Sequence, residues 1–140
     1  MQKNKYLKDG RLEDVLALLQ VLALDEDSHR SEAGLASELG DSPDSADTWS
    51  EIAKEHREFF RVVEGKQFPV SLVARHVSEE SGQKRPALSA ENTQALLNSA
   101  VEIHDRQIRR SQRWTVLIPV WVAVIGAVVT MIKLFFENGA

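Results

Sequence analysis

The feature that most constrains this chain is a stretch of 19 residues, 114–132, that contains no charged side chain. Extended to Phe136, it predicts a helix of 22 residues that starts at Thr115. Such a helix is roughly 33 Å long at about 1.5 Å per residue, and a bilayer core is about 30 Å thick. A chain of 140 residues rarely buries so long a helix on every face. We therefore expect a transmembrane helix over residues 114–136, with a buried core helix as the alternative.

The flanking charges predict an orientation for this helix. Four arginines precede it, and no lysine or arginine follows Lys133. Because positively charged residues stay on the cytoplasmic side of a span, we expect the preceding part to be cytoplasmic, with the inner membrane as its location in a bacterium. Residues 137–140 would form a short tail beyond it, as in a tail-anchored, single-pass protein. The arginines are also expected to contact anionic lipid headgroups: Arg106, Arg109, Arg110 and Arg113.

Small residues recur at four-residue spacing within the expected span. This spacing lets two membrane helices approach closely, and it predicts that copies of the chain associate into a homo-oligomer. Small residues also occur in membrane helices by chance, which is the alternative. The four positions are Ala123, Gly126, Ala127 and Thr130.

Charge is distributed unevenly along the rest of the chain. Residues 1–80 hold 10 Lys or Arg against 17 Asp or Glu, whereas residues 81–113 hold 6 against 3. We expect an acidic cytoplasmic domain over 1–80, a basic linker over 81–113, the span over 114–136 and the tail over 137–140. The chain has no cysteine, which excludes disulfides, thiolate nucleophiles and cysteine metal sites.

The linker contains a pattern typical of an amphipathic helix. The helix is expected to begin near Ala90, with Ser89 as its N-cap. It would serve as a stalk that contacts lipid or a partner, or it would be only a solvated connection to the membrane. The spacing also permits a short coiled coil. The expected apolar face, opposite the arginines, consists of Leu97, Val101, His104 and Ile108.

Periodicity in residues 1–80 predicts a fold that is mainly α with a small β-hairpin. Helices are expected over 11–24, with Asp9 as a cap, over 31–39, ending at Gly40, and over 46–57. The runs "FFRVV" and "FPVSLVARHV" favour strands, and "EGKQ" between them contains Gly65, a hairpin signal. Pro69 at the start of the second run indicates an edge strand.

This order of helix, helix, turn, helix and hairpin resembles the winged helix-turn-helix superfamily over about residues 8–78. The stretch "DTWSEIAKEHREFFRVVEGK" is similar to a recognition helix that runs into a wing. The resemblance implies a winged-helix-like domain, and many such domains place the third helix in the major groove of DNA. A three-helix cap on a hairpin, unrelated to that superfamily, predicts nearly the same structure.

The charge of the domain argues against DNA as the partner. Phosphate contacts need Lys and Arg, whereas the third helix and its approach carry more acidic than basic residues. Because the acidic domain repels DNA, we expect a protein partner instead. The candidate partner face consists of Trp49, Lys54, Arg57, Arg61 and Lys66.

Chemistry-bearing residues form no catalytic or metal motif. The histidines are scattered, and His56 and His104 lie on apolar helical stripes, where packing is the usual role. The sequence contains no HExxH zinc motif, phosphate-binding glycine loop or nucleophile elbow. We therefore expect a non-enzyme without a cofactor or a metal. The serines that might serve as nucleophiles are better explained as helix caps: Ser28, Ser31 and Ser45.

Together these patterns favour a membrane-tethered protein–protein interaction module, either an adaptor or a subunit of a membrane assembly. The run "VLALLQVLAL", residues 15–24, is more apolar than one small core requires, which predicts contact with a second copy. One alternative is a membrane-bound winged-helix transcription regulator. Another is a membrane effector whose clustered spans perturb the bilayer.

Overall fold

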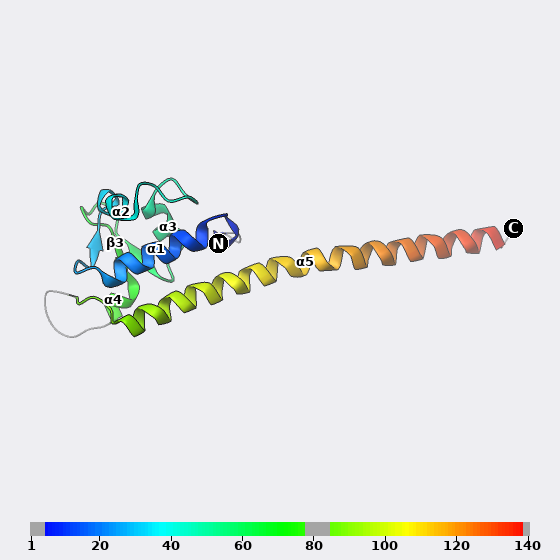
Figure 1. The fold of residues 1–140 in the computed structure, drawn as a ribbon. Coiled ribbons are helices and arrows are strands. Elements are labelled where there is room, and N and C mark those ends of the chain that lie inside the picture. The colour runs from blue at the N-terminus through cyan, green and yellow to red at the C-terminus, as the bar shows by residue number, and fades with distance from the viewer. Residues whose placement is uncertain (1–4, 78–84, 139–140) are drawn as a thin grey trace. The chain divides into compact units, whose positions relative to one another are not determined.

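The computed structural model describes residues 5–77 and 85–138, except for the side chains of 77, 113–117 and 138. The protein is mainly helical, with a small antiparallel sheet and a long C-terminal helix, as the sequence predicts (Figure 1). The chain divides into two compact units, the first ending at His104 and the second beginning at Asp105. The elements are η1 (Lys5–Leu7), α1 (Arg11–Leu24), β1 (His29–Arg30), α2 (Glu32–Leu39), α3 (Trp49–Glu55), β2 (Phe60–Val62), β3 (Val70–Leu72), α4 (Val73–Val77) and α5 (Ala90–Asn138).

Helix α1 has the predicted bounds, and α2 begins at Glu32, one residue later than predicted. Helix α1 begins at Arg11, but the predicted cap at Asp9 is wrong, because Gly10 occupies the N-cap with φ 72° and no side chain caps the helix. Helix α2 is capped by Ser31, whose Oγ accepts the Gly34 N–H at 3.1 Å. It ends at Gly40, whose φ of 77° is the left-handed conformation that glycine adopts without strain.

Helix α3 is shorter than the 12 residues predicted. It begins at Trp49 because Thr48, in an extended conformation, is the N-cap and accepts the Glu51 N–H at 3.1 Å. It ends at Glu55, and His56 is the C-cap residue. The predicted apolar stripe therefore extends one residue beyond the helix, although His56 itself is fully buried.

The sheet has three strands in the order β1-β3-β2, and both pairings are antiparallel. The predicted hairpin is present, with Gly65 at φ 79° in its turn. Its second strand is shorter than predicted, because β3 ends at Leu72 and Val73–Val77 form helix α4 instead. The prediction that Pro69 marks an edge strand is wrong, because β3 is the central strand. Pro69 lies one residue before that strand, where its missing N–H removes no ladder bond, and its carbonyl accepts the Val63 N–H at 2.9 Å. Strand β1, His29–Arg30, is not predicted by the sequence pattern.

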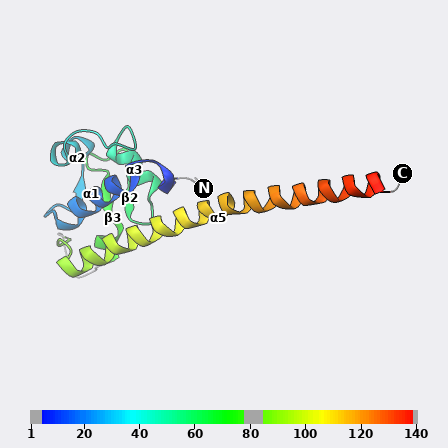
Figure 2. The ribbon, with the colours of Figure 1, turned by 45° about the vertical axis from the view of Figure 1, so that its right-hand side comes forward.

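The core of the first unit lies between α1, α3, the sheet and the first turns of α5. The α1 residues Val15, Leu18 and Leu22 are buried, and Ala100 of α5 is 0% exposed. Figures 1 and 2 both show the first turns of α5 running along this unit. The folded unit therefore extends past the predicted boundary at residue 80. Three further α5 residues pack against the core: Leu96, Leu97 and Ile103.

Helix α5 continues without interruption into the second unit. Pro119 lies inside this helix, which begins at Ala90. A proline there removes one backbone hydrogen bond. The predicted apolar face of the linker is partly wrong, since Val101 is 38% exposed while its neighbour Ala100 is buried.

Candidate functional site

Trp49, predicted to be part of the partner face, belongs to the core instead. Its side chain is 3% exposed, and its indole Nε1 donates to the Asp41 carbonyl at 2.8 Å. Its backbone N–H donates to Glu32 Oε1 at 2.7 Å, which joins α3 to α2. A buried tryptophan with a satisfied N–H is a packing residue, so it cannot contact a partner without local unfolding.

The four basic residues of the predicted partner face are all exposed. Lys54 Nζ forms an ion pair with Glu64 at 2.7 Å, and this hydrogen bond lowers the pKa of the Glu64 carboxyl. Among the residues that the structure describes, Arg57, Arg61 and Lys66 have no carboxylate partner for their side chains. The hairpin therefore carries exposed positive charge in an otherwise acidic unit.

A row of polar residues crosses the outer face of the sheet, which is the face opposite Phe60 and Leu72. Ser71 at its centre is fully buried, His29 is half-buried and Arg61 is exposed. His29 on β1 pairs with Ser71 on β3, and Ser71 pairs with Arg61 on β2. Paired residues of neighbouring strands project from the same face, so these three side chains are neighbours. The adjacent positions, Phe60 and Leu72, are buried in the core, as alternation along a strand requires.

Helix α4 brings a second histidine to this row. His76 Nε2 lies 3.0 Å from Ser71 Oγ and 3.3 Å from Arg85 Nη1. The His29 and His76 rings are 5.5 Å apart, edge to face. Burial lowers the pKa of both histidines, and the positive charge of Arg85 lowers it further. The histidines are scattered in the sequence, and only the fold of β1, β3 and α4 brings these two together.

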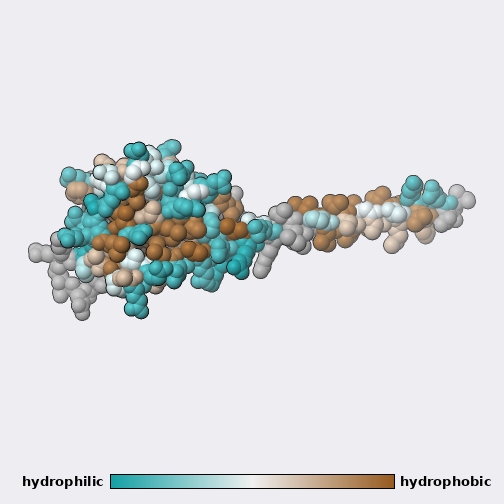
Figure 3. All heavy atoms as spheres, in the orientation of Figure 1, coloured by the Kyte–Doolittle hydropathy of each residue, from teal (hydrophilic) through white to brown (hydrophobic). Residues whose placement is uncertain are grey.

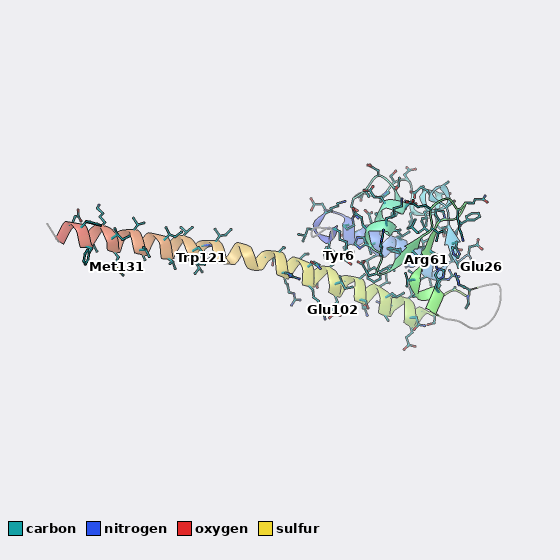
Figure 4. All side chains as sticks on the ribbon, turned by 180° about the vertical axis from the view of Figure 1, so that it is seen from behind. Tyr6, Glu26, Arg61, Glu102, Trp121 and Met131 are labelled. Carbon is teal, nitrogen blue, oxygen red and sulfur yellow. The ribbon has the colours of Figure 1, made fainter. Side chains whose placement is uncertain are left out.

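A separate polar cluster lies beside η1. Lys5 Nζ pairs with Glu58 Oε2 at 2.7 Å, and the Tyr6 hydroxyl also donates to Glu58. His56 Nδ1 lies 3.2 Å from Glu58 Oε1, and its ring packs edge to face on Tyr6 at 4.7 Å. Burial, followed by the charge of Lys5, lowers the pKa of His56 to about 3. This histidine is therefore neutral at pH 7. Figure 4 labels Tyr6 and Arg61 at different places on the first unit.

Two buried arginines hold the unit together. Arg11 forms an ion pair with Glu55 and donates to the Ser45 carbonyl at 2.8 Å. Arg75 is 1% exposed and donates to five backbone carbonyls at 2.7–3.2 Å. Each buried guanidinium thus has acceptors for its charge, as burial requires. The five acceptors belong to Leu22, Asp25, Glu26, Asp27 and Arg85.

An open groove of about 470 Å³ lies between α1 and α2. Its apolar part includes Val21, Leu24 and Leu39, and Leu24 is 52% exposed. Its polar end holds Arg30, which pairs with Glu38 at 2.8 Å and also with Asp25. Figure 3 shows hydrophobic surface gathered over α1. Apolar walls with a few polar groups are typical of a binding surface.

In the second unit, residues Ile118–Glu137 form a segment of 20 residues with none of its surface buried. By length and composition this segment can cross a membrane. Trp121 and Met131 project outward from the helix in Figure 4, and they are 64% and 73% exposed. The preceding Arg109 and Arg110 are exposed, as is Arg106, while the side chain of Arg113 lies outside the described residues.

The small residues of the predicted span-packing face are exposed as well. Gly126 has no neighbouring atom within 4 Å of the position where a Cβ would lie. The Thr130 hydroxyl donates to the Gly126 carbonyl at 2.8 Å, so its polar hydrogen is satisfied within the helix. Ala123 and Ala127 have small side chains, which do not obstruct the close approach of another helix. The geometry leaves this face accessible to a second helix.

Within residues 5–77 and 85–138, no three His, Asp or Glu side chains are placed to hold a metal ion. Comparison of the chain with protein families, curated proteins and solved structures finds no match. The part of the chain that the structure describes is mainly helical with a small antiparallel sheet, and its helix α5 is long and apolar enough to cross a membrane.

Proposed function

We propose that this chain is a membrane-tethered protein–protein interaction module, an adaptor or subunit of a membrane assembly. The observation that carries the proposal is α5. From Thr93 to Ile103 this helix packs on the folded core, and from Ile118 to Glu137 it is apolar and fully exposed. An exposed apolar surface of this extent is unfavourable in water. A bilayer provides the apolar environment that the segment needs.

The proposed orientation rests on the arginines of α5. Arg106, Arg109 and Arg110 are exposed and precede the apolar segment. Cytoplasmic flanks of membrane helices are enriched in such residues, and they also interact favourably with anionic headgroups. In this proposal the winged-helix-like first unit is therefore cytoplasmic, and the chain crosses the membrane once.

The surface of the first unit favours a protein partner over DNA. A helix that enters the major groove needs cationic side chains for phosphate contacts. Helix α3 contributes Lys54, but its charge is paired with Glu64, and the helix also carries Glu51 and Glu55. The groove between α1 and α2 instead combines apolar walls with an ion-paired end. We assign this groove as the partner site.

A site-specific crosslink tests the proposal. A photo-crosslinking amino acid replaces Gln20, which lines the groove, in the full chain expressed in its source cells. The control variant carries it at Glu91, which is exposed on α5. We expect a discrete heterologous adduct from Gln20 and not from Glu91, and Leu24→Arg should abolish it. The protein should also remain in the membrane after an alkaline carbonate wash.

Three results would contradict the proposal. Release of the chain by carbonate would contradict the proposed membrane anchoring. Equal adducts from Gln20 and Glu91 would show that the groove is not the partner site. Retention of DNA by the full chain in detergent at low salt, lost at high salt, would favour the transcription regulator instead.

A further inference from the structure

The outer face of the sheet concentrates positive charge that the rest of the unit does not neutralise. Elsewhere in the first unit, most basic side chains pair with carboxylates: Lys5 with Glu58, Lys8 and Arg11 with Glu55, Arg30 with Glu38, and Lys54 with Glu64. In the described part of the chain, Arg61, Lys66 and Arg85 have no such partner. These exposed cations make one face of an acidic chain locally positive.

These side chains converge because of the fold. Arg61 is brought to Ser71 by the β2–β3 register, and His29 is brought to Ser71 by the β1–β3 register. His76 reaches back from α4 to within 3.0 Å of Ser71 Oγ, and Arg85 approaches His76 to 3.3 Å. The three strands, α4 and Arg85 thus all contribute polar groups to one surface.

The cations on this surface also act on the two histidines. After burial, the charges of Arg85, Arg61 and Arg75 lower the pKa of both His29 and His76, and Lys66 also acts on His29. Arg75 donates to backbone carbonyls, and the charge of Asp27 partly offsets the lowering of its pKa by burial. The remaining cations act on the two rings from exposed positions, where an anion can reach them.

The hydrogen-bonding groups on this face suit an anion. An arginine N–H can only donate, so His76 Nε2 accepts from Arg85, which assigns the ring proton to Nδ1. Arginine forks match the oxygens of a phosphate group, and two imidazoles can add N–H donors when they are protonated. A carboxylate offers fewer oxygens and less charge than a phosphate monoester.

We propose that this face of the sheet binds a phosphate group through Arg61 and Arg85, with His29 and His76 beside it. The ligand is a phosphorylated small molecule or the headgroup of a phosphate-monoester lipid; both present the same chemistry. Lys66 adds positive charge at the edge of the site. The site is separate from the groove between α1 and α2 and does not depend on the function proposed for that groove.

Histidine titration by NMR tests the proposal in the full chain in uncharged detergent micelles. Inorganic phosphate is added at constant ionic strength, with sodium chloride as the matched control. A bound phosphate should raise the pKa of His29 and His76, because an opposite charge favours the protonated ring. The resonances of His56 and His104, which lie beside Tyr6, should not respond.

Variants separate a specific site from general charge attraction. Arg61→Gln and Arg85→Gln should each weaken phosphate binding about tenfold or more, the effect of losing one charged hydrogen bond. Arg57→Gln removes the same charge from an exposed residue outside the row and should leave the affinity almost unchanged. The amide spectra of all three variants should match the wild type, which confirms that they are folded.

A second arm identifies the source of the phosphate. The chain is placed in phosphatidylcholine nanodiscs with or without phosphatidate. A response to phosphatidate but not to inorganic phosphate assigns the site to a lipid headgroup, and a response to both assigns it to soluble ligands as well. No response in either arm, or equal weakening by Arg57→Gln, overturns the proposal.

Discussion

Replacement of His56 by glutamine should make the stability of the first unit less dependent on pH between pH 7 and pH 5. The His56 ring is fully buried, and burial together with Lys5 and Arg11 lowers its pKa from 6.5 to about 3. The unfolded chain therefore binds a proton in this range that the folded chain does not. The contribution of neutral His56 to stability is fully present above pH 6.5, and it is lost as the pH falls from 6.5 towards 3.

The magnitude follows from the two pKa values. Between pH 7 and pH 5, protonation of the unfolded chain at His56 lowers the free energy of unfolding by about 2 kcal/mol. For a unit of this size that is roughly 8–15 °C in Tm. Glutamine cannot titrate, yet its amide N–H can still donate to Glu58, which lies 3.2 Å from the imidazole. His29 and His76 also have lowered pKa values, but they contribute equally to both proteins and cancel in the comparison.

Urea unfolding in detergent micelles at pH 7, 6 and 5 provides the measurement. Trp49 fluorescence reports on the core if Trp114 and Trp121 are replaced by phenylalanine in every protein compared. The free energy of unfolding of the wild type should fall by about 2 kcal/mol more than that of His56→Gln between pH 7 and pH 5. The control His29→Gln, at a half-buried ring, should give an intermediate pH dependence. Equal dependence in the wild type and His56→Gln would refute the reasoning.

Three other predictions concern packing, burial and the membrane. Ala100→Leu should destabilise the first unit by about 1–3 kcal/mol, because Ala100 is fully buried in the core, where added methylenes overpack. Ser99→Leu, at an exposed position, should have little effect in the same urea assay. Arg75→Met leaves buried carbonyls without donors and should cost about 2 kcal/mol or more; unchanged stability would show that water replaces the guanidinium. Val128→Arg places a charge within the apolar segment, at an insertion cost of about 2.5–3.5 kcal/mol. It should therefore increase the fraction of the protein extracted by carbonate. Phe136→Arg, near the end of that segment, should be tolerated, and equal extraction of both variants would contradict a span at these positions.

Much of the helical structure could be predicted from the sequence because its signals are local. The apolar period of α1 and the Ser31 and Gly40 caps of α2 depend only on neighbouring residues. The length of the apolar segment is equally local. Strand β1 could not be predicted, because two residues have no period and His29–Arg30 becomes a strand only by pairing with β3.

The candidate sites were harder to predict because they depend on tertiary contacts. The position of Trp49 in a helix does not indicate which face of that helix is covered, and in the structure Glu32 of α2 and Asp41 contact it. Arg61 and Lys66 were found through their charge alone. His29 and His76 are 47 residues apart, and only the sheet and the turn into α4 bring their rings together. No spacing rule in the sequence could reveal that contact.

The small size of the sheet has a consequence for aggregation. Its central strand, β3, is paired on both sides, while the edge strands β1 and β2 have only two and three residues. Edges this short offer little template for the strand of another chain, and Arg61 adds a charge to one of them. If the chain is concentrated in a membrane, its copies will collide often. The brevity of the sheet edges then lets folded units meet repeatedly without joining into fibrils.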